Sequence, residues 1–331
     1  MNSAEEPTLE LSLVIPLYNE EESLSELKAW IDRTLAGRKY EVIFVDDGSK
    51  DRSWSVIAQL AEADPERVVG VRLAKNYGKS AALHTGFARV RGSVVVTMDA
   101  DLQDSPEEIP ALEAMILQEG WDLVSGWKAK RYDPLTKTLP TKLYNWATRK
   151  VSGIELHDFN CGLKAYRFEV VKEIELQGEM HRYIPILAKN AGFHRITEKP
   201  VQHQARKYGT SKFGVERFVN GFLDLMTIGF MSRFSRKPMH FFGALGVLMF
   251  TLSALGFGVI AANKLWALVL ERWMGQALTV KNITELSAFY LSLTGMILGA
   301  QFFLAGFLAE MISRNDPHRT AYQIRTVLKR S

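Results

Sequence analysis

The stretch SVVVTMDADLQD, from Ser93 to Asp104, is the most informative part of this chain. Its apolar run Val94–Val96 predicts a buried β-strand. The strand is followed by two carboxylates one residue apart, Asp99 and Asp101, and Gln103 adds an oxygen ligand two residues later. Oxygen ligands that leave coordination positions open are typical of Mg²⁺ or Mn²⁺ sites shared with phosphates. An acidic turn that caps the next helix is the alternative interpretation.

Four further apolar segments predict β-strands that alternate with helices. They are Leu11–Leu17, Tyr40–Val45, Val68–Leu73 and Trp121–Gly126. After the acidic stretch, the sequence SPEE at 105–108 predicts a helix start with a capping box. Strands and helices alternating at this spacing predict an α/β fold with a mostly parallel, doubly wound sheet.

Ligands of such sheets bind beyond the carboxyl ends of the strands. The turn DDGS, which contains Asp46 and Asp47, follows one predicted strand, while Asp99 and Asp101 follow another. We therefore expect the two acidic sites to face one crevice. Lys79, in the sequence GKS, is a candidate phosphate contact, and a solvated lysine at a helix start is an equal alternative. A P-loop is excluded because leucine stands where that motif needs its first glycine.

Length and composition narrow the class of protein. The chain has 331 residues, enough for one large domain or two, and its net charge of +4 is too weak to indicate nucleic-acid binding. Its single cysteine, Cys161, excludes an intrachain disulfide and favours a reducing compartment. The polar, acidic N-terminus lacks the pattern of a signal peptide, so we expect the first domain in the cytosol. The oligomeric state stays open, with a homo-oligomer among the possibilities.

The last third of the chain has the composition of a membrane domain. Phe241–Ala262 and Leu286–Ala309 contain no charged residue, and each is about 33 to 36 Å long as a helix, enough to cross a bilayer core. Lysines and arginines before the first span and after the second predict that both termini are cytoplasmic. We therefore expect an integral protein of a bacterial inner membrane.

Phe213–Phe234 is apolar with a polar stripe at helical spacing, which predicts a helix in the membrane interface. An amphipathic helix packed on the first domain is the alternative. The predicted organisation is thus a cytosolic domain over 1–212, an interfacial segment over 213–237 and a membrane domain over 238–331.

Two groups of basic residues precede the membrane segment. Lys128, Lys130 and Arg131 follow the last predicted strand, with Lys142 further on, while Arg206, Lys207 and Lys212 lie closer to the first span. Such clusters attract anionic headgroups or hold one lipid phosphate by charge-assisted bonds. Nonspecific attraction is the alternative for the second group.

These motifs together resemble one known family. VIPLYNEE, VDDGSKD, NYGKSAAL, MDADLQDSPEEIP and HDFNCGLKAYR are similar to motifs of family-2 glycosyltransferases with a GT-A fold. The two C-terminal spans narrow the resemblance to polyprenyl-phosphate glycosyltransferases, such as the GtrB-type glucosyltransferases and dolichol-phosphate mannose synthase. The QxxRW motif of processive members is absent from the sequence, which argues against a polysaccharide synthase. The resemblance implies a GT-A catalytic domain followed by an interfacial amphipathic helix and two transmembrane helices.

The resemblance also implies roles for individual residues. Nucleotide contacts fall on Pro16, Tyr18, Glu20, Asp46, Asp47 and Asp99, with Lys79 as a further candidate. Metal ligands fall on Asp101 and Gln103, with Asp99 near the metal or the ribose. The candidate catalytic carboxylates are Asp158, which orients the acceptor or the donor sugar or acts as a base, and the metal ligand Asp101. The acceptor phosphate is expected at Lys128, Arg131 and Lys142, with Arg206 and Lys212 as further candidates. The family often carries arginines at the positions of Lys128 and Lys142. Lysine lacks the planar guanidinium that lets arginine form two parallel hydrogen bonds to a phosphate.

The implied reaction moves one sugar from a nucleotide-diphosphate sugar to a polyprenyl phosphate, with inversion and with Mg²⁺ or Mn²⁺. The acceptor phosphate is largely a dianion at neutral pH and hardly needs a general base, so Asp158 is expected to orient the acceptor or the donor sugar. UDP-glucose is the first expectation for the donor, and GDP-mannose is the alternative. A membrane-tethered binding module without catalysis is the alternative of another class, and intact Asp99, Asp101 and Gln103 argue against it. A transporter is disfavoured because two spans without charges offer no polar pathway.

Overall fold

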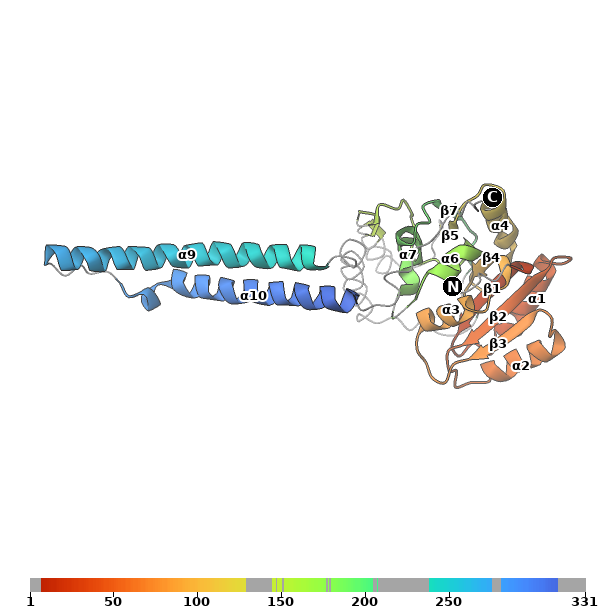
Figure 1. The fold of residues 1–331 in the computed structure, drawn as a ribbon. Coiled ribbons are helices and arrows are strands. Elements are labelled where there is room, and N and C mark those ends of the chain that lie inside the picture. Colours follow the sequence, from red (N-terminus) through yellow and green to blue (C-terminus); the bar gives the residue numbers. More distant parts are fainter. Residues whose placement is uncertain are drawn as a thin grey trace, which may run out of the picture. The chain divides into compact units, whose positions relative to one another are not determined.

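The computed structural model describes residues 7–128, 145–146, 148–150, 152–176, 178, 180–204, 207, 238–275 and 281–314. The chain divides into two compact units, residues 1–229 and 230–331 (Figure 1). The predicted interfacial helix at 213–234, and the predicted domain boundaries after 212 and 237, lie outside the described residues and stay predictions.

The first unit contains a seven-stranded sheet in the order β3-β2-β1-β4-β6-β5-β7. All neighbouring strands are parallel except β6, which runs antiparallel to both β4 and β5. The prediction of a mostly parallel doubly wound sheet is therefore confirmed. The strands are β1 (Leu9–Leu17), β2 (Tyr40–Asp46), β3 (Val68–Arg72), β4 (Gly92–Thr97), β5 (Leu123–Trp127), β6 (Lys164–Arg167) and β7 (Ile196–Pro200).

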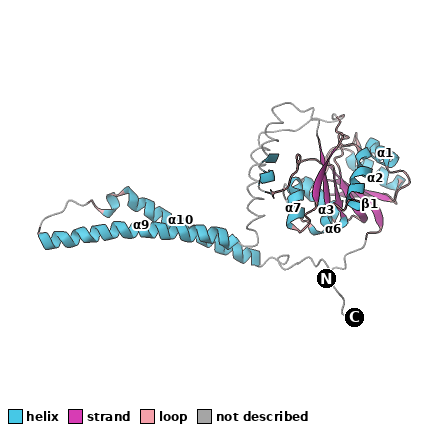
Figure 2. Cartoon of the chain, turned by 90° about the horizontal axis from the view of Figure 1, so that it is seen from above, coloured by secondary structure: helices cyan, strands magenta, loops and turns pink. Residues whose placement is uncertain are grey.

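Helices cover both faces of this sheet (Figure 2). On one face the core contains side chains of α1 (Leu24–Thr34), α2 (Ser53–Ala63) and α4 (Ile109–Leu117). On the other face it contains side chains of α3 (Lys79–Phe87), α6 (Phe168–Glu173) and α7 (Ile184–Asn190). Because the central strands are covered on both sides, their sequences are continuous apolar runs rather than alternating patterns. Two short 3₁₀ helices, η1 (Pro106–Glu108) and η2 (Met180–Tyr183), complete the described elements of this unit.

Two local features differ from the sequence-based expectations. Strands β6 and β7 carry several polar residues and were not predicted from hydrophobic patterning. At the predicted capping box, Ser105 does accept a bond from the Glu107 amide at 3.3 Å. The Glu108 carboxylate, expected to complete the box, accepts instead from the Gln202 amide at 3.1 Å and from the Lys199 ammonium. The helix start is therefore tied to the segment after β7 rather than closed on itself.

The second unit is a pair of long apolar helices, α9 (Pro238–Met274) and α10 (Ser287–Arg314), with a short 3₁₀ helix, η3 (Ile283–Glu285), before α10. Both are long and apolar enough to cross a membrane over Met239–Met274 and Ser287–Ile312. Only 6% and 11% of their most apolar windows are buried, unlike helices in the core of a soluble domain. The helix α9 extends beyond the predicted end of the first span at Ala262.

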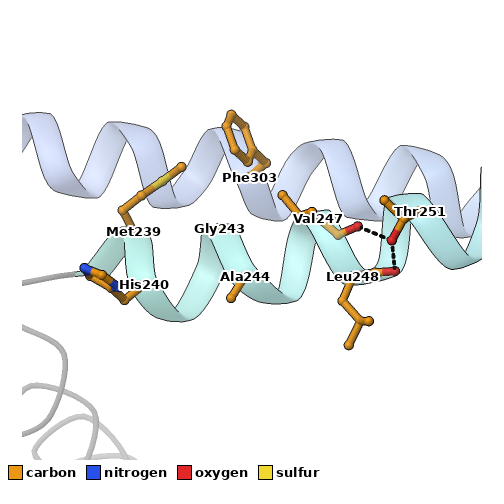
Figure 3. Close-up of a pocket in the computed structure, with 8 residues that line it drawn as sticks. All are labelled: Met239, His240, Gly243, Ala244, Val247, Leu248, Thr251 and Phe303. Atoms are coloured by element: carbon orange, nitrogen blue, oxygen red, sulfur yellow. Dashed lines mark hydrogen bonds between the residues drawn. The ribbon is translucent and has the colours of Figure 1, made fainter.

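Glycines let the two helices touch along their backbones. A Cβ added at Gly246 would lie 2.6 Å from the Gly299 carbonyl oxygen and 2.6 Å from the Phe303 nitrogen. Small residues at such contacts allow the close approach that stabilises helix pairs in lipid. Beside this contact, an open groove of about 550 Å³ runs along the first turns of α9 between Met239 and Thr251, with Phe303 of α10 on its wall (Figure 3).

We expect Gly246→Ala to destabilise the helix pair and Gly258→Ala to leave it intact. The new methyl at 246 would push the backbones apart, at a cost of about 1–3 kcal/mol, whereas nothing lies within 4 Å of a Cβ at Gly258. Alanine is also the better helix former, so the control variant should be neutral or slightly stabilised. Thermal unfolding of the full chain in detergent measures the difference, and equal midpoints for the two variants would refute the close contact.

Candidate functional site

The candidate site lies at one edge of the sheet. Strands β1, β2 and β4 are parallel, so their carboxyl ends meet there. Because β6 is antiparallel to β4, with Thr97 opposite Lys164, the start of β6 lies at the same edge. Segments that are far apart in the sequence therefore meet where parallel sheets bind their ligands.

The loop after β4 has an unusual backbone. Leu102 has a φ of 61°, in the left-handed region that a residue with a side chain adopts at a cost of about 1–2 kcal/mol. Its side chain is buried in the hydrophobic core on the face of the sheet that α1, α2 and α4 cover. Asp101, on one side of it, is 93% buried by the same packing and accepts a bond from the Gln103 amide at 3.2 Å. Strain at such a position is typical of functional loops. The strained residue lies between Asp101 and Gln103, so both predicted metal ligands belong to one short turn.

Asp99 is paired with Lys79. The Lys79 ammonium donates to the Asp99 carboxylate across the gap between α3 and β4. Burial alone would raise the pKa of Asp99, but the charge and hydrogen bond of Lys79 override it and lower this pKa to about 2. Gly162 lies directly against this carboxylate, since a Cβ there would meet an Asp99 oxygen at 2.6 Å. Lys79 is therefore a partner of Asp99 in this structure, while a phosphate contact stays a prediction.

Asp46 and Asp47 hold the loops of the site together. The fully buried Asp46 accepts from the Ser49 amide at 2.8 Å and lies 3.4 Å from the Arg72 guanidinium. The Asp47 carboxylate accepts from two consecutive backbone amides, those of Tyr77 and Gly78, at 2.7 and 2.8 Å. Each oxygen of Asp47 thus ties the loop after β2 to the loop after β3. A carboxylate can accept further bonds, so the predicted nucleotide contacts are compatible with these ties.

The loop after β1 is tied to the same turn. The Asn19 amide donates to Ser49 Oγ at 2.9 Å, and the Lys50 amide donates to Asn19 Oδ1 at 2.8 Å. The Glu20 amide donates to Ser53 Oγ at 2.9 Å at the start of α2. The predicted nucleotide contacts Tyr18 and Glu20 on this loop, and Pro16 near the end of β1, therefore lie near Asp46 and Asp47. Sequence and structure agree that these motifs meet at one place.

Asp158 is almost completely buried, and it shapes the turn before β6. Its Oδ1 accepts from the Asn160 amide at 3.0 Å. The preceding His157 stacks on Trp127 with ring centroids 4.4 Å apart, and its ring is paired with Glu198. This stack holds the turn against the ends of β5 and β7, so Asp158 is rigidly placed.

Lys128 also has a partner that the sequence did not predict. Its ammonium lies 3.3 Å from a carboxylate oxygen of Asp104, and the His203 ring lies 3.5 Å from the same oxygen. Burial alone would lower the pKa of Lys128, but Asp104 overrides it and raises this pKa. The ion pair holds the charged end of Lys128 next to the loop that carries Asp101 and Gln103. The other predicted acceptor-phosphate residues, Arg131, Lys142, Arg206 and Lys212, lie outside the described residues.

A small cavity next to Asp99 contains residues that the sequence analysis missed. Lys79, Asp99 and Cys161 line it, together with Lys164 at the start of β6 and His181 of η2. Lys164 is buried, and its ammonium donates to the Cys161 carbonyl oxygen. The motif HDFNCGLKAYR contains Lys164, but no local signal in the sequence marks this lysine as buried. Cys161 is buried in the cavity wall, and burial raises the pKa of its thiol to about 12.

The residues of the Asp101 loop suit a divalent cation shared with a ligand. In the part of the chain that the structure describes, no three His, Cys, Asp or Glu side chains gather into a closed metal site. One buried carboxylate and one amide in a turn, with Asp99 nearby, form instead an open set of hard oxygen donors. Mg²⁺ and Mn²⁺ are bound in this way when phosphate oxygens supply further ligands.

His181 should make the protein sensitive to mild acid. Burial, and then the charge of Lys79, lower the pKa of His181 to about 2, so the folded state keeps it neutral while the unfolded state binds a proton below about pH 6.5. The free energy of unfolding that the neutral His181 contributes is present above pH 6.5 and is lost as the pH falls.

Between pH 7.5 and 5.5 the free energy of unfolding of wild type should fall by about 1 kcal/mol more than that of His181→Gln. Unfolding midpoints at the two pH values measure this, and the exposed His84→Gln should behave like wild type; a His181→Gln variant that loses as much as wild type would contradict it.

Comparisons with known proteins identify the family to which this chain belongs. Residues 12–175 match the glycosyl transferase family 2. Dodecaprenyl-phosphate galacturonate synthase of Rhizobium johnstonii is 34% identical over 93% of this chain and 88% of its own length. Undecaprenyl-phosphate 4-deoxy-4-formamido-L-arabinose transferase of Pseudomonas aeruginosa LESB58 is 38% identical over 92% of this chain and 86% of its own length. The chain therefore belongs to the family-2 glycosyltransferases and is a glycosyltransferase.

A solved structure supports the fold. Glucosyl-3-phosphoglycerate synthase of Mycobacterium tuberculosis, in complex with Mn²⁺, UDP-glucose and phosphoglyceric acid, superposes with a TM-score of 0.53 at 20% identity. The similarity covers 68% of this chain and 80% of that chain. Together with the family match, it confirms the predicted GT-A fold of the first unit.

Proposed function

We propose that this enzyme transfers a single sugar from a UDP-sugar to a polyprenyl phosphate at the cytoplasmic face of a membrane, with inversion at the anomeric carbon. The observation that carries the proposal is the combination, in one chain, of the Asp99–Gln103 loop at the carboxyl edge of the sheet with two helices of membrane length. The relatives named for dodecaprenyl and undecaprenyl phosphate match more than nine-tenths of the chain. They support a long polyprenyl phosphate as the acceptor.

The donor stays open between several sugars. The expectation of UDP-glucose rests on the resemblance alone, whereas these relatives are named for galacturonate and for 4-deoxy-4-formamido-L-arabinose. The structural neighbour was solved with UDP-glucose and Mn²⁺, which supports a uridine nucleotide and a divalent cation. We therefore propose a UDP-sugar, with GDP-mannose as the donor that the test must exclude.

In the proposed mechanism the loops after β1, β2 and β3 hold the nucleotide. Asp47 keeps two of them together through the Tyr77 and Gly78 amides. Asp101 and Gln103 would hold Mg²⁺ or Mn²⁺, which stabilises the charge of the departing diphosphate when bound. Lys79 fixes the Asp99 carboxylate beside this loop.

The acceptor phosphate attacks the anomeric carbon of the donor sugar, and the bond from that carbon to the diphosphate breaks. As a dianion, the phosphate carries its own nucleophilic oxygen and releases no proton in this step. Asp158, which the Asn160 amide and the His157–Trp127 stack hold in place, would orient a sugar hydroxyl. Lys128 would contribute positive charge for the acceptor from its place beside Asp104.

The direct test is a transfer assay with the purified full chain in detergent. Undecaprenyl phosphate is incubated with UDP-glucose, UDP-galacturonate, UDP-4-deoxy-4-formamido-L-arabinose or GDP-mannose, with Mg²⁺ or with EDTA, and the lipid product is weighed by mass spectrometry. We expect a polyprenyl-phosphate sugar with one UDP-sugar and a loss of product in EDTA. Nucleotide-sugar binding without any glycosylated lipid would instead support a binding module, and product from GDP-mannose alone would overturn the uridine donor.

A further inference from the structure

We propose that Lys79 controls when the divalent cation binds. In the enzyme without donor, its ammonium keeps the Asp99 carboxylate from binding the cation, and the diphosphate of the arriving donor draws the ammonium away. Lys79 is then a positioning residue that makes cation and donor bind together. This inference rests on the function proposed above and concerns the assembly of the same site, but binding measurements alone test it.

The first argument is that little of the Asp99 carboxylate is open to a cation. Its Oδ1 accepts from the Lys79 ammonium. The backbone of Gly162 lies against the same group, since a Cβ there would lie 2.6 Å from one Asp99 oxygen and 2.9 Å from the other. A cation on this carboxylate would lie next to an ammonium, and two positive charges at such a distance repel each other. Lys79 therefore has to move before a cation binds tightly to Asp99.

The second argument is space. Pro16, Lys79 and Asp99 are among the residues that line the small cavity, which has about 10 Å³ of free volume. This is room for about one water molecule. Mg²⁺ dehydrates reluctantly and usually keeps several of its water ligands. A hydrated cation therefore does not fit beside Asp99 on the cavity side while the Lys79 side chain stays in place.

The third argument is that the neighbouring lysines have other partners. The Lys128 ammonium lies 3.3 Å from an Asp104 oxygen, and Lys164 donates to a backbone carbonyl oxygen. The charge of Lys128 also favours the ionised form of Asp99, but less than the charge of Lys79 does. Removal of Lys79 is therefore the change that should make Asp99 available.

The fourth argument is that Lys79 can change partner. The side chains of Lys79 and Asp99 are 32% and 34% exposed, so the pair is not enclosed in the core. Lys79 is the first residue of α3 and follows Gly78, whose amide Asp47 ties to the predicted nucleotide site. Its ammonium thus lies between that site and Asp99. A diphosphate carries more negative charge than one carboxylate, and lysine is a common phosphate ligand.

The test is the binding of Mn²⁺ to the purified full chain in detergent, measured by electron paramagnetic resonance with and without UDP. We expect wild type to bind Mn²⁺ at least about tenfold more tightly with UDP than without it. Lys79→Met keeps the length of the side chain without its charge. Without UDP it should bind Mn²⁺ at least about fivefold more tightly than wild type does, because Asp99 is then available. Without metal it should bind UDP more weakly.

Three further variants separate this role from a general effect of charge or fold. Lys79→Arg keeps the charge and should bind Mn²⁺ like wild type. Asp99→Asn added to Lys79→Met should remove the gain in Mn²⁺ affinity, because the gain acts through this carboxylate. The exposed Lys75→Met removes one positive charge from the preceding loop, and as the matched control it should behave like wild type.

Several outcomes would overturn this inference. They are an unchanged or weaker Mn²⁺ affinity of Lys79→Met without UDP, an equal gain in Lys75→Met, or a gain that persists after Asp99→Asn. If Lys79→Met does not fold, Lys79→Gln provides the same comparison, and equal Mn²⁺ affinities of wild type with and without UDP would refute the inference without any variant. The proposed function fails separately, when no sugar reaches the lipid in the transfer assay.

Discussion

Asp101→Asn is expected to lower kcat by at least about 100-fold while the protein stays folded. Asparagine keeps the carbonyl oxygen that accepts from the Gln103 amide, so the strained turn around Leu102 can persist. What it removes is the negative charge that would hold the divalent cation on the leaving diphosphate, and charge stabilisation of this kind is worth about 100- to 1000-fold in rate.

Initial rates of lipid glycosylation at saturating donor measure this effect, with a thermal unfolding curve to confirm the fold. The exposed Glu66→Gln, which removes one carboxylate charge far from the Asp101 turn, is the control and should retain wild-type rates. A loss of less than about threefold in Asp101→Asn would mean that this carboxylate does not hold the metal.

Gly48→Ala is expected to have the second large effect, on both stability and nucleotide affinity. Gly48 has a φ of 72°, and a Cβ there would lie 2.5 Å from the Lys75 carbonyl carbon. The methyl would therefore force apart the loops that Asp47 ties together. We expect a loss of about 3 kcal/mol or more in unfolding free energy, and at least about a tenfold weaker binding of UDP.

Gly37→Ala separates strain from the clash. Gly37 has a φ of 79°, but nothing lies within 4 Å of its added Cβ. Both variants pay about 1–2 kcal/mol for the left-handed backbone, and only Gly48→Ala adds the steric conflict. Denaturation and calorimetric UDP titrations of the two variants provide the comparison. Equal losses of stability with unchanged UDP affinity would show that the contact with Lys75 does not matter to the nucleotide site.

Much of this architecture could be predicted from the sequence, because its parallel strands are buried on both faces and read as apolar runs. β1, β2 and β4 were predicted within two residues of their observed ends. The acidic residues at their carboxyl ends were expected to share one crevice, and they do meet at one edge of the sheet. The two apolar spans of α9 and α10 were equally clear from composition and length.

The partners of the charged side chains could not be predicted. Lys79 with Asp99 and Lys128 with Asp104 are ion pairs between segments that only the fold brings together. β6 was missed because it is four residues long and carries two charged side chains, so neither its length nor its hydrophobicity marks a strand. Lys164 was missed with it, since a lysine outside any predicted strand suggests solvent rather than a buried cavity.

The direction of β6 has a consequence for how the protein folds. This strand lies between β4 and β5, and its pairing with β4 joins residues that are remote along the chain. Contacts of such long sequence separation form slowly, because the chain entropy of closing the loop must be lost first. During synthesis, β2 and β4, which precede the loops that carry Asp47 and Asp101, can join the sheet before β6 emerges, while Asp158 and Lys164 arrive only with β6. We therefore expect that a chain in which β6 has not yet paired binds nucleotide weakly and cannot transfer sugar, and that activity appears only after β6 has joined the sheet.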